Sequence, residues 1–111
     1  MSNKIKISFV LPEALQRDLK LMLIADGYDL KAKSKWVSEA VERLLVMENF
    51  THLVKLNDEM SGFEKMESIV VESALKLKIN ESALMVRKDY PILEGVQSRI
   101  LRTAIVQRLL R

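Results

Sequence analysis

The chain has 111 residues, of which 49% are hydrophobic and 30% are charged, and these proportions are typical of one small globular domain and exclude a disordered tail. With two Pro, three Gly and no Cys, the composition excludes collagen, a disulfide scaffold, a Cys-ligated zinc site and a cysteine nucleophile. The net charge of +3 is unevenly spread. Residues 1–47 hold eight Lys/Arg and six Asp/Glu, residues 48–67 hold two Lys/Arg and five Asp/Glu, and residues 68–111 hold eight Lys/Arg and four Asp/Glu. A polyanion would therefore prefer the two flanking segments.

Two features of the chain predict a soluble, cytoplasmic protein. The N-terminal stretch carries Lys4 and Lys6 among its apolar residues, which is unlike a signal peptide. Nowhere does the chain approach the roughly 18 uninterrupted apolar residues that a membrane-spanning helix requires.

Residues 4–11 alternate in polarity along the chain. The residues of one face are Ile5, Ile7, Phe9 and Leu11, and those of the other face are Lys4, Lys6, Ser8 and Val10. This period of two and the β-branched residues predict a half-buried strand, which Pro12 ends. Because a single strand would expose an edge and a whole apolar face, it needs a partner strand.

Two helices are expected after this strand. The first covers about residues 12–26, where apolar residues recur at helical spacing, and Gly27 supplies its end. After a short loop over residues 28–33, Ser34 is the expected N-cap of the second helix, whose apolar stripe can continue past Met47.

Residues 48–66 form an acidic connector between the two halves of the chain. Its apolar residues at helical spacing can extend the preceding helix; they are Phe50, Leu53, Val54 and Leu56. The pair Ser61-Gly62 is the expected break of that extension.

The second half of the chain repeats the pattern of the first. Residues 9–15 align with residues 69–75 at an offset of 60, and residues 34–37 (SKWV) align with residues 98–101 (SRIL) at an offset of 64. The four extra residues fall between the helices, where an insertion costs little. The pattern indicates an approximate internal duplication of a strand–helix–helix unit.

The duplication also predicts the partner strand. Residues 5–10 are expected to pair antiparallel with residues 67–71, within one chain or exchanged between two chains, because about 47 residues bury too little surface to fold alone. The expected fold is mainly α, with a short antiparallel β-ribbon and four main helices.

Residues 74–79 leave two assignments open. They alternate like a strand, and they also place apolar residues at helical spacing. A helix over residues 73–88 is favoured because it matches the first half in length. If the strand were here instead, Lys76 and Lys78 would take the outward positions of the ribbon.

Three features of the first half occur together: a basic alternating strand that ends in Pro, a helix that ends at Gly27, and the sequence SKWVSEAVERLL at residues 34–45. In this combination the chain resembles the ribbon-helix-helix superfamily, which includes the Arc, MetJ and CopG repressors. The resemblance covers residues 4–47 well and residues 67–110 more weakly. A tandem copy in one chain is similar to the TraY-like accessory proteins of conjugative plasmids. The resemblance implies one repeat in residues 1–47, a helical extension and acidic connector in residues 48–66, and a second repeat in residues 67–111, with a shared core.

In that superfamily the ribbon enters the major groove of double-stranded DNA. The resemblance implies base contacts from Lys4, Lys6, Ser8 and Ser68. It implies phosphate contacts at the start of the second helix of each repeat, from Lys33, Ser34, Lys35, Ser98, Arg99 and Arg102. Both helix-start serines are expected to be N-caps first, with any phosphate contact in addition.

The second strand departs from the family's pattern. The residues that match Lys4 and Lys6 are Glu64 and Met66, and a glutamate would repel phosphate. Either the DNA is read asymmetrically or the second repeat serves structure. An exposed lysine row can also be an ordinary solvated ribbon face that blocks aggregation.

Two functions stay open on the sequence. The first is a bacterial sequence-specific DNA-binding protein, acting as a transcriptional regulator or as a plasmid or conjugation (relaxosome) accessory factor, with a relaxase, toxin or partition protein as a possible partner and with homo-oligomers on DNA. The alternative is an antitoxin-like or assembly module that binds a protein and does not read DNA. The acidic connector and the second strand, which has no lysine at the positions that match Lys4 and Lys6, favour this alternative.

Catalysis finds no support in the sequence. It contains no nucleophile–base constellation, no Gly-rich phosphate loop and no acidic metal cluster, so we expect no enzyme, no metal and no cofactor. The single histidine, His52, is assigned to the surface, and Trp36 to the core.

Overall fold

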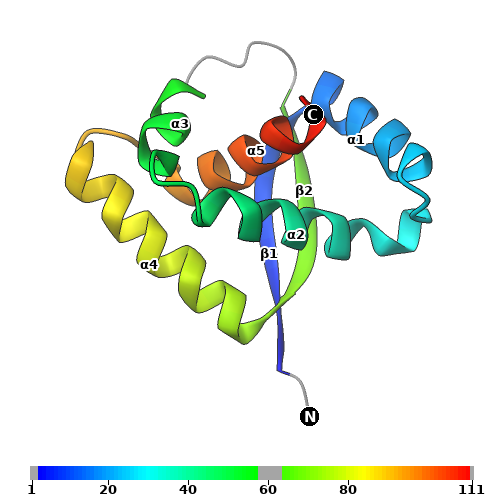
Figure 1. Cartoon of the computed structure of the whole chain (residues 1–111), viewed down its shortest axis with the longest axis horizontal. Coiled ribbons are helices and arrows are strands. Elements are labelled where there is room, and N and C mark those ends of the chain that lie inside the picture. The colour runs from blue at the N-terminus through cyan, green and yellow to red at the C-terminus, as the bar shows by residue number, and fades with distance from the viewer. Residues whose placement is uncertain (1–2, 58–63, 111) are drawn as a thin grey trace.

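The computed structural model describes residues 3–57 and 64–110. Over these residues the elements are β1 (Lys4–Pro12), α1 (Glu13–Ala25), a 3-10 turn η1 (Leu30–Ala32), α2 (Lys33–Leu45), α3 (Phe50–Leu56), β2 (Glu64–Glu72), α4 (Ser73–Asp89) and α5 (Val96–Leu109), as Figure 1 shows. The order strand, helix, helix occurs twice, and we call β1, α1 and α2 the first half and β2, α4 and α5 the second half. A mainly helical fold with one antiparallel ribbon is therefore confirmed.

The two strands pair with each other along their full length in one chain. The register sets Lys4 opposite Glu72, Ser8 opposite Ser68 and Pro12 opposite Glu64. The expected pairing of residues 5–10 with residues 67–71 is confirmed, and it extends further at both ends. Because β2 begins at Glu64, a division of the chain at residue 67 falls inside the strand.

One face of the ribbon forms the floor of the hydrophobic core. Its buried residues are Ile7, Phe9, Leu11, Ile69 and Val71. Helices α2 and α5 pack on each other across this face, with α5 against β1 and α2 against β2, while α1 and α4 lie at opposite sides of the ribbon (Figure 1). The alternate residues of both strands, which lie on the other face, are exposed or half-exposed.

The two open assignments after β2 are now decided. Residues 73–89 form helix α4, so the favoured helix is confirmed and a strand over residues 74–79 is wrong. The buried residues Leu75, Ile79 and Val86 follow helical spacing, whereas Leu77, which suggested a strand, is exposed. Lys76 and Lys78 therefore do not lie on the ribbon.

The connector differs from its expected form. Helix α2 ends at Leu45, and Phe50–Leu56 is a separate short helix, so the described residues contain five α-helices where four main ones were expected. Phe50 and Val54 are buried, and α3 packs against α4 and α5, which favours a separate helix over a continuation of α2. The predicted break at Ser61-Gly62 lies outside the described residues.

Other expectations hold at single positions. Trp36 is fully buried and His52 is exposed. Gly27 follows α1 with φ of +81°, a conformation that favours glycine. None of the helices in residues 3–57 and 64–110 is both long and apolar enough to cross a membrane.

Candidate nucleic-acid interface

The uncovered face of the ribbon presents a row of side chains to solvent. We call it the outer face; it consists of Lys4, Lys6, Ser8 and Val10 of β1 and Glu64, Met66, Ser68, Val70 and Glu72 of β2. The strand register places the Ser8–Ser68 pair at its centre. The predicted base-contacting residues Lys4, Lys6, Ser8 and Ser68 are thus brought together on one surface.

The outer face differs chemically from end to end. Lys6 lies opposite Val70 on one side of the central serine pair, and Val10 lies opposite Met66 on the other. Lysine can donate to guanine O6 and N7, serine can donate or accept, and apolar groups can contact the thymine methyl group. Between its two outermost pairs, where Glu72 faces Lys4 and Glu64 faces Pro12, the face therefore offers a donor side, a neutral centre and an apolar side.

Sequence reasoning placed Val10 and Met66 in this row but gave its apolar members no binding role, because it considered only hydrogen-bonding residues. Met66 is 69% exposed and Val70 is 43% exposed, although both are apolar residues. The alternation of the strand indicates both positions, because residues 66 and 70 are each two residues from Ser68 and so lie on the same face. Only the pairing with β1 shows which lysine or valine each of them faces.

The two helix-start serines make the same contact in both halves. The hydroxyl of Ser34 accepts a hydrogen bond from the Val70 N–H at 3.0 Å, and the hydroxyl of Ser98 accepts one from the Val10 N–H at 3.3 Å. The strand residues are related by the offset of 60 and the serines by the offset of 64. Each serine thus ties the first turn of a helix to an outer edge of the ribbon, α2 to β2 and α5 to β1.

The expectation that these serines are N-caps is wrong. Helix α2 follows Ala32 and helix α5 follows Gly95, and neither helix has a side-chain cap. The serines lie inside the first turn, and their hydroxyls accept from a strand N–H and not from a helix N–H. The first-turn N–H groups of both helices therefore lie beside the ribbon, where they can bind an anionic oxygen.

The predicted phosphate-contacting cations have different surroundings. Lys35 is exposed and its ammonium lies 5.9 Å from the centre of the Tyr28 ring. Arg99 donates from Nε to the Glu94 carbonyl at 2.8 Å, and Arg102 donates to the Val10 carbonyl at 3.4 Å. Arg99 therefore lies at the start of α5, whereas Arg102 lies further along the helix, beside β1.

Lys33 forms an ion pair with Glu67 of β2. Burial disfavours the charged form of Glu67, but hydrogen bonds from Lys33 and from Gln16 outweigh burial and lower the pKa of its carboxyl group. The charged carboxylate neutralises Lys33, so we rank Lys35 above Lys33 as a phosphate ligand.

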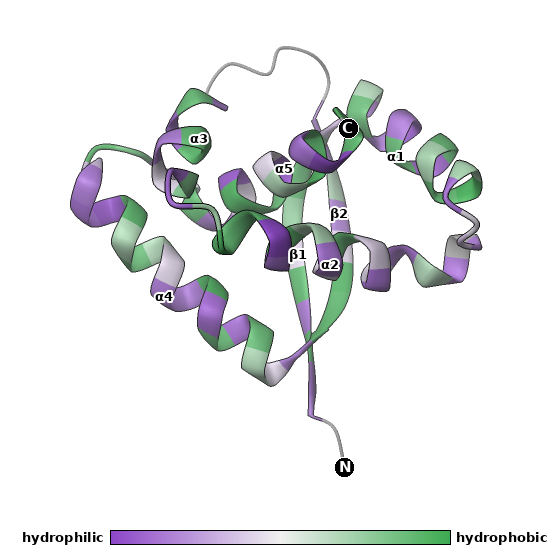
Figure 2. Cartoon of the chain, viewed as in Figure 1, coloured by the Kyte–Doolittle hydropathy of each residue, from purple (hydrophilic) through white to green (hydrophobic). Residues whose placement is uncertain are grey.

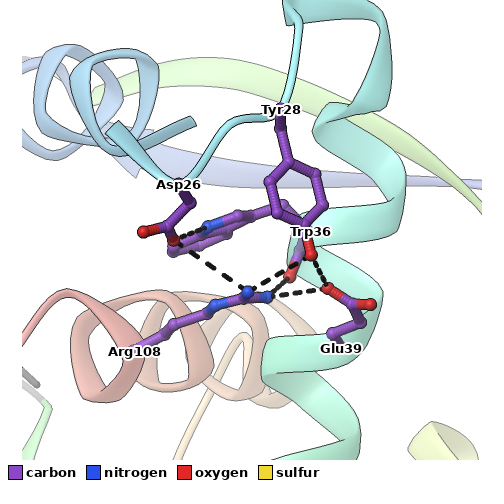
Figure 3. Close-up of polar contacts among 5 residues, drawn as sticks. All are labelled: Asp26, Tyr28, Trp36, Glu39 and Arg108. Atoms are coloured by element: carbon purple, nitrogen blue, oxygen red, sulfur yellow. Dashed lines mark hydrogen bonds and ion pairs between the residues drawn. The ribbon is translucent and has the colours of Figure 1, made fainter. Parts of the chain in front are cut away.

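A second polar cluster, which sequence reasoning missed, lies between α5 and the connection from α1 to α2. Figure 3 shows its members, Asp26, Tyr28, Trp36, Glu39 and Arg108. Arg108 donates to the Trp36 carbonyl at 2.7 Å and to Glu39 Oε1 at 3.1 Å, and its guanidinium carbon lies 4.4 Å from the centre of the Trp36 ring. The Trp36 indole N–H donates to Asp26 at 2.8 Å.

We call this cluster the clamp, because through it Arg108 of α5 contacts α2 and the connection from α1 to α2. The Arg108 side chain is only 5% exposed. The hydrogen bond from the Tyr28 hydroxyl, aided by Arg108, outweighs burial and lowers the pKa of Glu39. The sequence did contain a signal, because Arg108 stands at the position that the offset of 64 aligns with Leu44, inside an apolar stripe.

Within residues 3–57 and 64–110, no group of three His, Cys, Asp or Glu residues is arranged to hold a metal ion. Comparisons of the chain with protein-family models, with curated proteins and with solved structures each gave no match. What the chain does must therefore be inferred from its own residues and their geometry.

Proposed function

We propose that the chain is a tandem ribbon-helix-helix protein that binds double-stranded DNA through the outer face of its ribbon. The observation that carries this proposal is the repeated serine contact, in which Ser34 and Ser98 hold the starts of α2 and α5 against opposite edges of one ribbon. This arrangement supports a pair of equivalent strand–helix–helix units in one chain.

The geometry of the outer face favours DNA as the ligand. A two-stranded ribbon has the width that the major groove admits, and a row of outward side chains can then face the base edges. Lys4, Lys6 and the serine pair supply donors for base edges, and the first turns of α2 and α5, with Lys35, supply phosphate ligands on each flank. The fit requires no catalytic group.

The biological roles that accompany this proposal are transcriptional regulation and an accessory part in plasmid maintenance or transfer. Both roles need a protein that marks or bends a DNA site. The two ends of the outer face differ, so we expect an asymmetric site in place of a perfect palindrome, since palindromy reflects two-fold protein symmetry.

The proposal is tested by binding to a pool of duplex DNA at several salt concentrations. Phosphate contacts give a log–log slope of about −0.9 for each contact. We expect Lys6→Ala to weaken binding, and Lys88→Ala, which removes the same charge from an exposed position late in α4, to leave it nearly unchanged. A flat salt profile, or equal effects of the two substitutions, would contradict DNA binding.

A protein-binding module is the second candidate. Exposed Met66 and Val70, with acidic Glu64 and Glu72 beside them, give β2 an outer row that suits a protein surface better than a phosphate backbone. This candidate predicts a flat salt profile with DNA and loss of a protein partner after Met66→Asp.

A further inference from the structure

Two helices at opposite sides of the molecule keep large apolar residues in solvent. Leu21 and Ile24 of α1 are 62% and 66% exposed, and Leu77, Leu84 and Met85 of α4 are similarly exposed. Apolar and charged residues alternate along both helices (Figure 2), and the two helices flank the ribbon on opposite sides (Figure 1). Exposed apolar residues gathered on one helix face are typical of a contact surface.

A groove lies beside each of these helices. The groove between α1 and the end of α5 measures about 310 Å³ and is lined by Asp18, Leu21, Met22, Ala25 and Leu109. The groove between α4 and the end of α2 measures about 500 Å³, and its lining includes Leu45, Lys78, Glu81, Ser82 and Met85. Every lining residue of the first groove aligns with one of the second, at an offset of 60 on α1 and α4 and of 64 for the pair of leucines.

One aligned pair of lining residues carries opposite charges in the two grooves. Asp18 lines the groove at α1, and Lys78 lines the groove at α4 at the aligned position. If α1 of one copy packs antiparallel on α4 of another with Leu21 opposite Leu77, Arg17 comes opposite Glu81, and Asp18 and Lys78 are staggered by two residues, about 3 Å along the helix axes. One register thus forms two pairs of opposite charge and one apolar contact.

From these features we propose that α1 of one molecule docks on α4 of a second copy of this chain, head to tail. The α1 surface consists of Arg17, Asp18 and Leu21, and the α4 surface consists of Leu77, Lys78 and Glu81. A contact between two α1 helices in the same register would set Leu21 against Arg17, bring the two Asp18 carboxylates near each other and leave both α4 surfaces in water. The head-to-tail contact covers both surfaces of every internal molecule. Because it is heterologous, it does not close at a dimer and produces rows of molecules.

The docking is tested by sedimentation equilibrium of the full chain without DNA, from about 1 µM to 1 mM. The wild-type mean mass should rise with concentration past the dimer. Leu21→Asp and Leu77→Asp each block one surface, so each variant alone should remain at the monomer mass. An equimolar mixture retains one α1 surface and one α4 surface and should stop at a heterodimer.

The matched controls are Lys20→Asp on α1 and Asn80→Asp on α4, which are exposed and aligned with each other but line neither groove. Both should associate like the wild type. Thermal unfolding of every variant checks the fold, and since all four substituted residues are exposed we expect small shifts.

A charge reversal examines the register separately. Arg17→Glu and Glu81→Arg should each weaken association by about fivefold, and the two changes in one chain should restore it, because every contact then regains an opposite pair. A wild type that stays monomeric at all concentrations overturns the proposal. A dimer formed by Leu77→Asp alone, or by Leu21→Asp alone, also overturns it, since either means that like surfaces meet. All of these measurements are independent of the proposed DNA binding.

Discussion

The two halves of the chain agree on their buried sides and differ on their exposed sides. Aligned positions of the helices are buried and apolar in both halves; the pairs are Leu19/Ile79, Leu23/Ala83, Trp36/Ile100, Val37/Leu101 and Val41/Ile105. The outer ribbon differs, because Lys4 and Lys6 in the first half match Glu64 and Met66 in the second. Packing restricts what a buried position can hold, whereas a solvent-facing row can take on different chemistry in each half.

Two of the buried or half-buried positions that depart from this rule carry a charge in the second half. Leu44 aligns with Arg108, and Ile7 aligns with Glu67. In each case the second half holds a charged residue, and the first half supplies its partners, Glu39 and the Trp36 carbonyl for Arg108 and Lys33 with Gln16 for Glu67. The charged residues of the second half therefore need partners that the first half supplies. This need disfavours an assembly in which two identical halves from different chains pair with each other.

The largest expected effect comes from the buried side of the comparison. Ile7→Ala should lower the free energy of unfolding by roughly 2–5 kcal/mol, because it leaves a cavity beneath α2 and α5. Its neighbour Lys6 is exposed, so Lys6→Ala should cost no more than about 0.5 kcal/mol. Urea denaturation measures both. The opposite ranking would mean that the two ribbon faces have been interchanged.

Arg108→Leu places the residue of the first half into the second. We expect a loss of roughly 1.5–3 kcal/mol, because the hydrogen bonds to Glu39 and to the Trp36 carbonyl disappear and a leucine cannot replace them. Arg43→Leu, at an exposed position of α2, is the matched control and should change stability by about 0.5 kcal/mol at most. Equal stabilities of the two variants would show that the clamp contributes nothing.

The exposed difference between the two halves can be tested by giving the second strand the outer-face residue of the first. Met66→Lys gives the second strand the lysine that the first strand has, and under the proposed function it should raise DNA affinity while Lys6→Ala lowers it, each by about 1–3 kcal/mol. Titration of one DNA site with all three proteins measures the changes. An unchanged affinity for both variants would mean that the outer face does not meet the bases.

The smallest expected effect is a dependence of stability on pH. The pKa values of Glu39 and Glu67 are lowered in the folded protein, so their contribution is complete above the unfolded value of about 4.5 and is lost as the pH falls below it. Unfolding experiments between about pH 6 and pH 3 should show this loss, and Glu67→Gln should reduce it. A wild-type pH profile in that variant would mean that the pair with Lys33 does not act on stability.

Much of the fold followed from local features of the sequence. The period of two at residues 4–11, the helical spacing that follows Pro12 and the stop at Gly27 are set by neighbouring residues, so they could be recognised without the rest of the chain. The repeat at offsets of 60 and 64 then indicated which strand pairs with β1. The lysines and serines of the outer face were found in the same way.

Only the tertiary structure decided the features that depend on contacts between residues distant in the sequence. The donors to Ser34 and Ser98 are strand N–H groups, which displaced the serines from the cap positions their residue type favours. The break before α3 follows from burial of Phe50 and Val54 against α4 and α5. Arg108 could enter an apolar stripe because acceptors from α2 and the turn before it surround it. Periodicity shows which side of an element faces inward, but the identity of the partner across the core is set by packing between elements, and that information is not local in the chain.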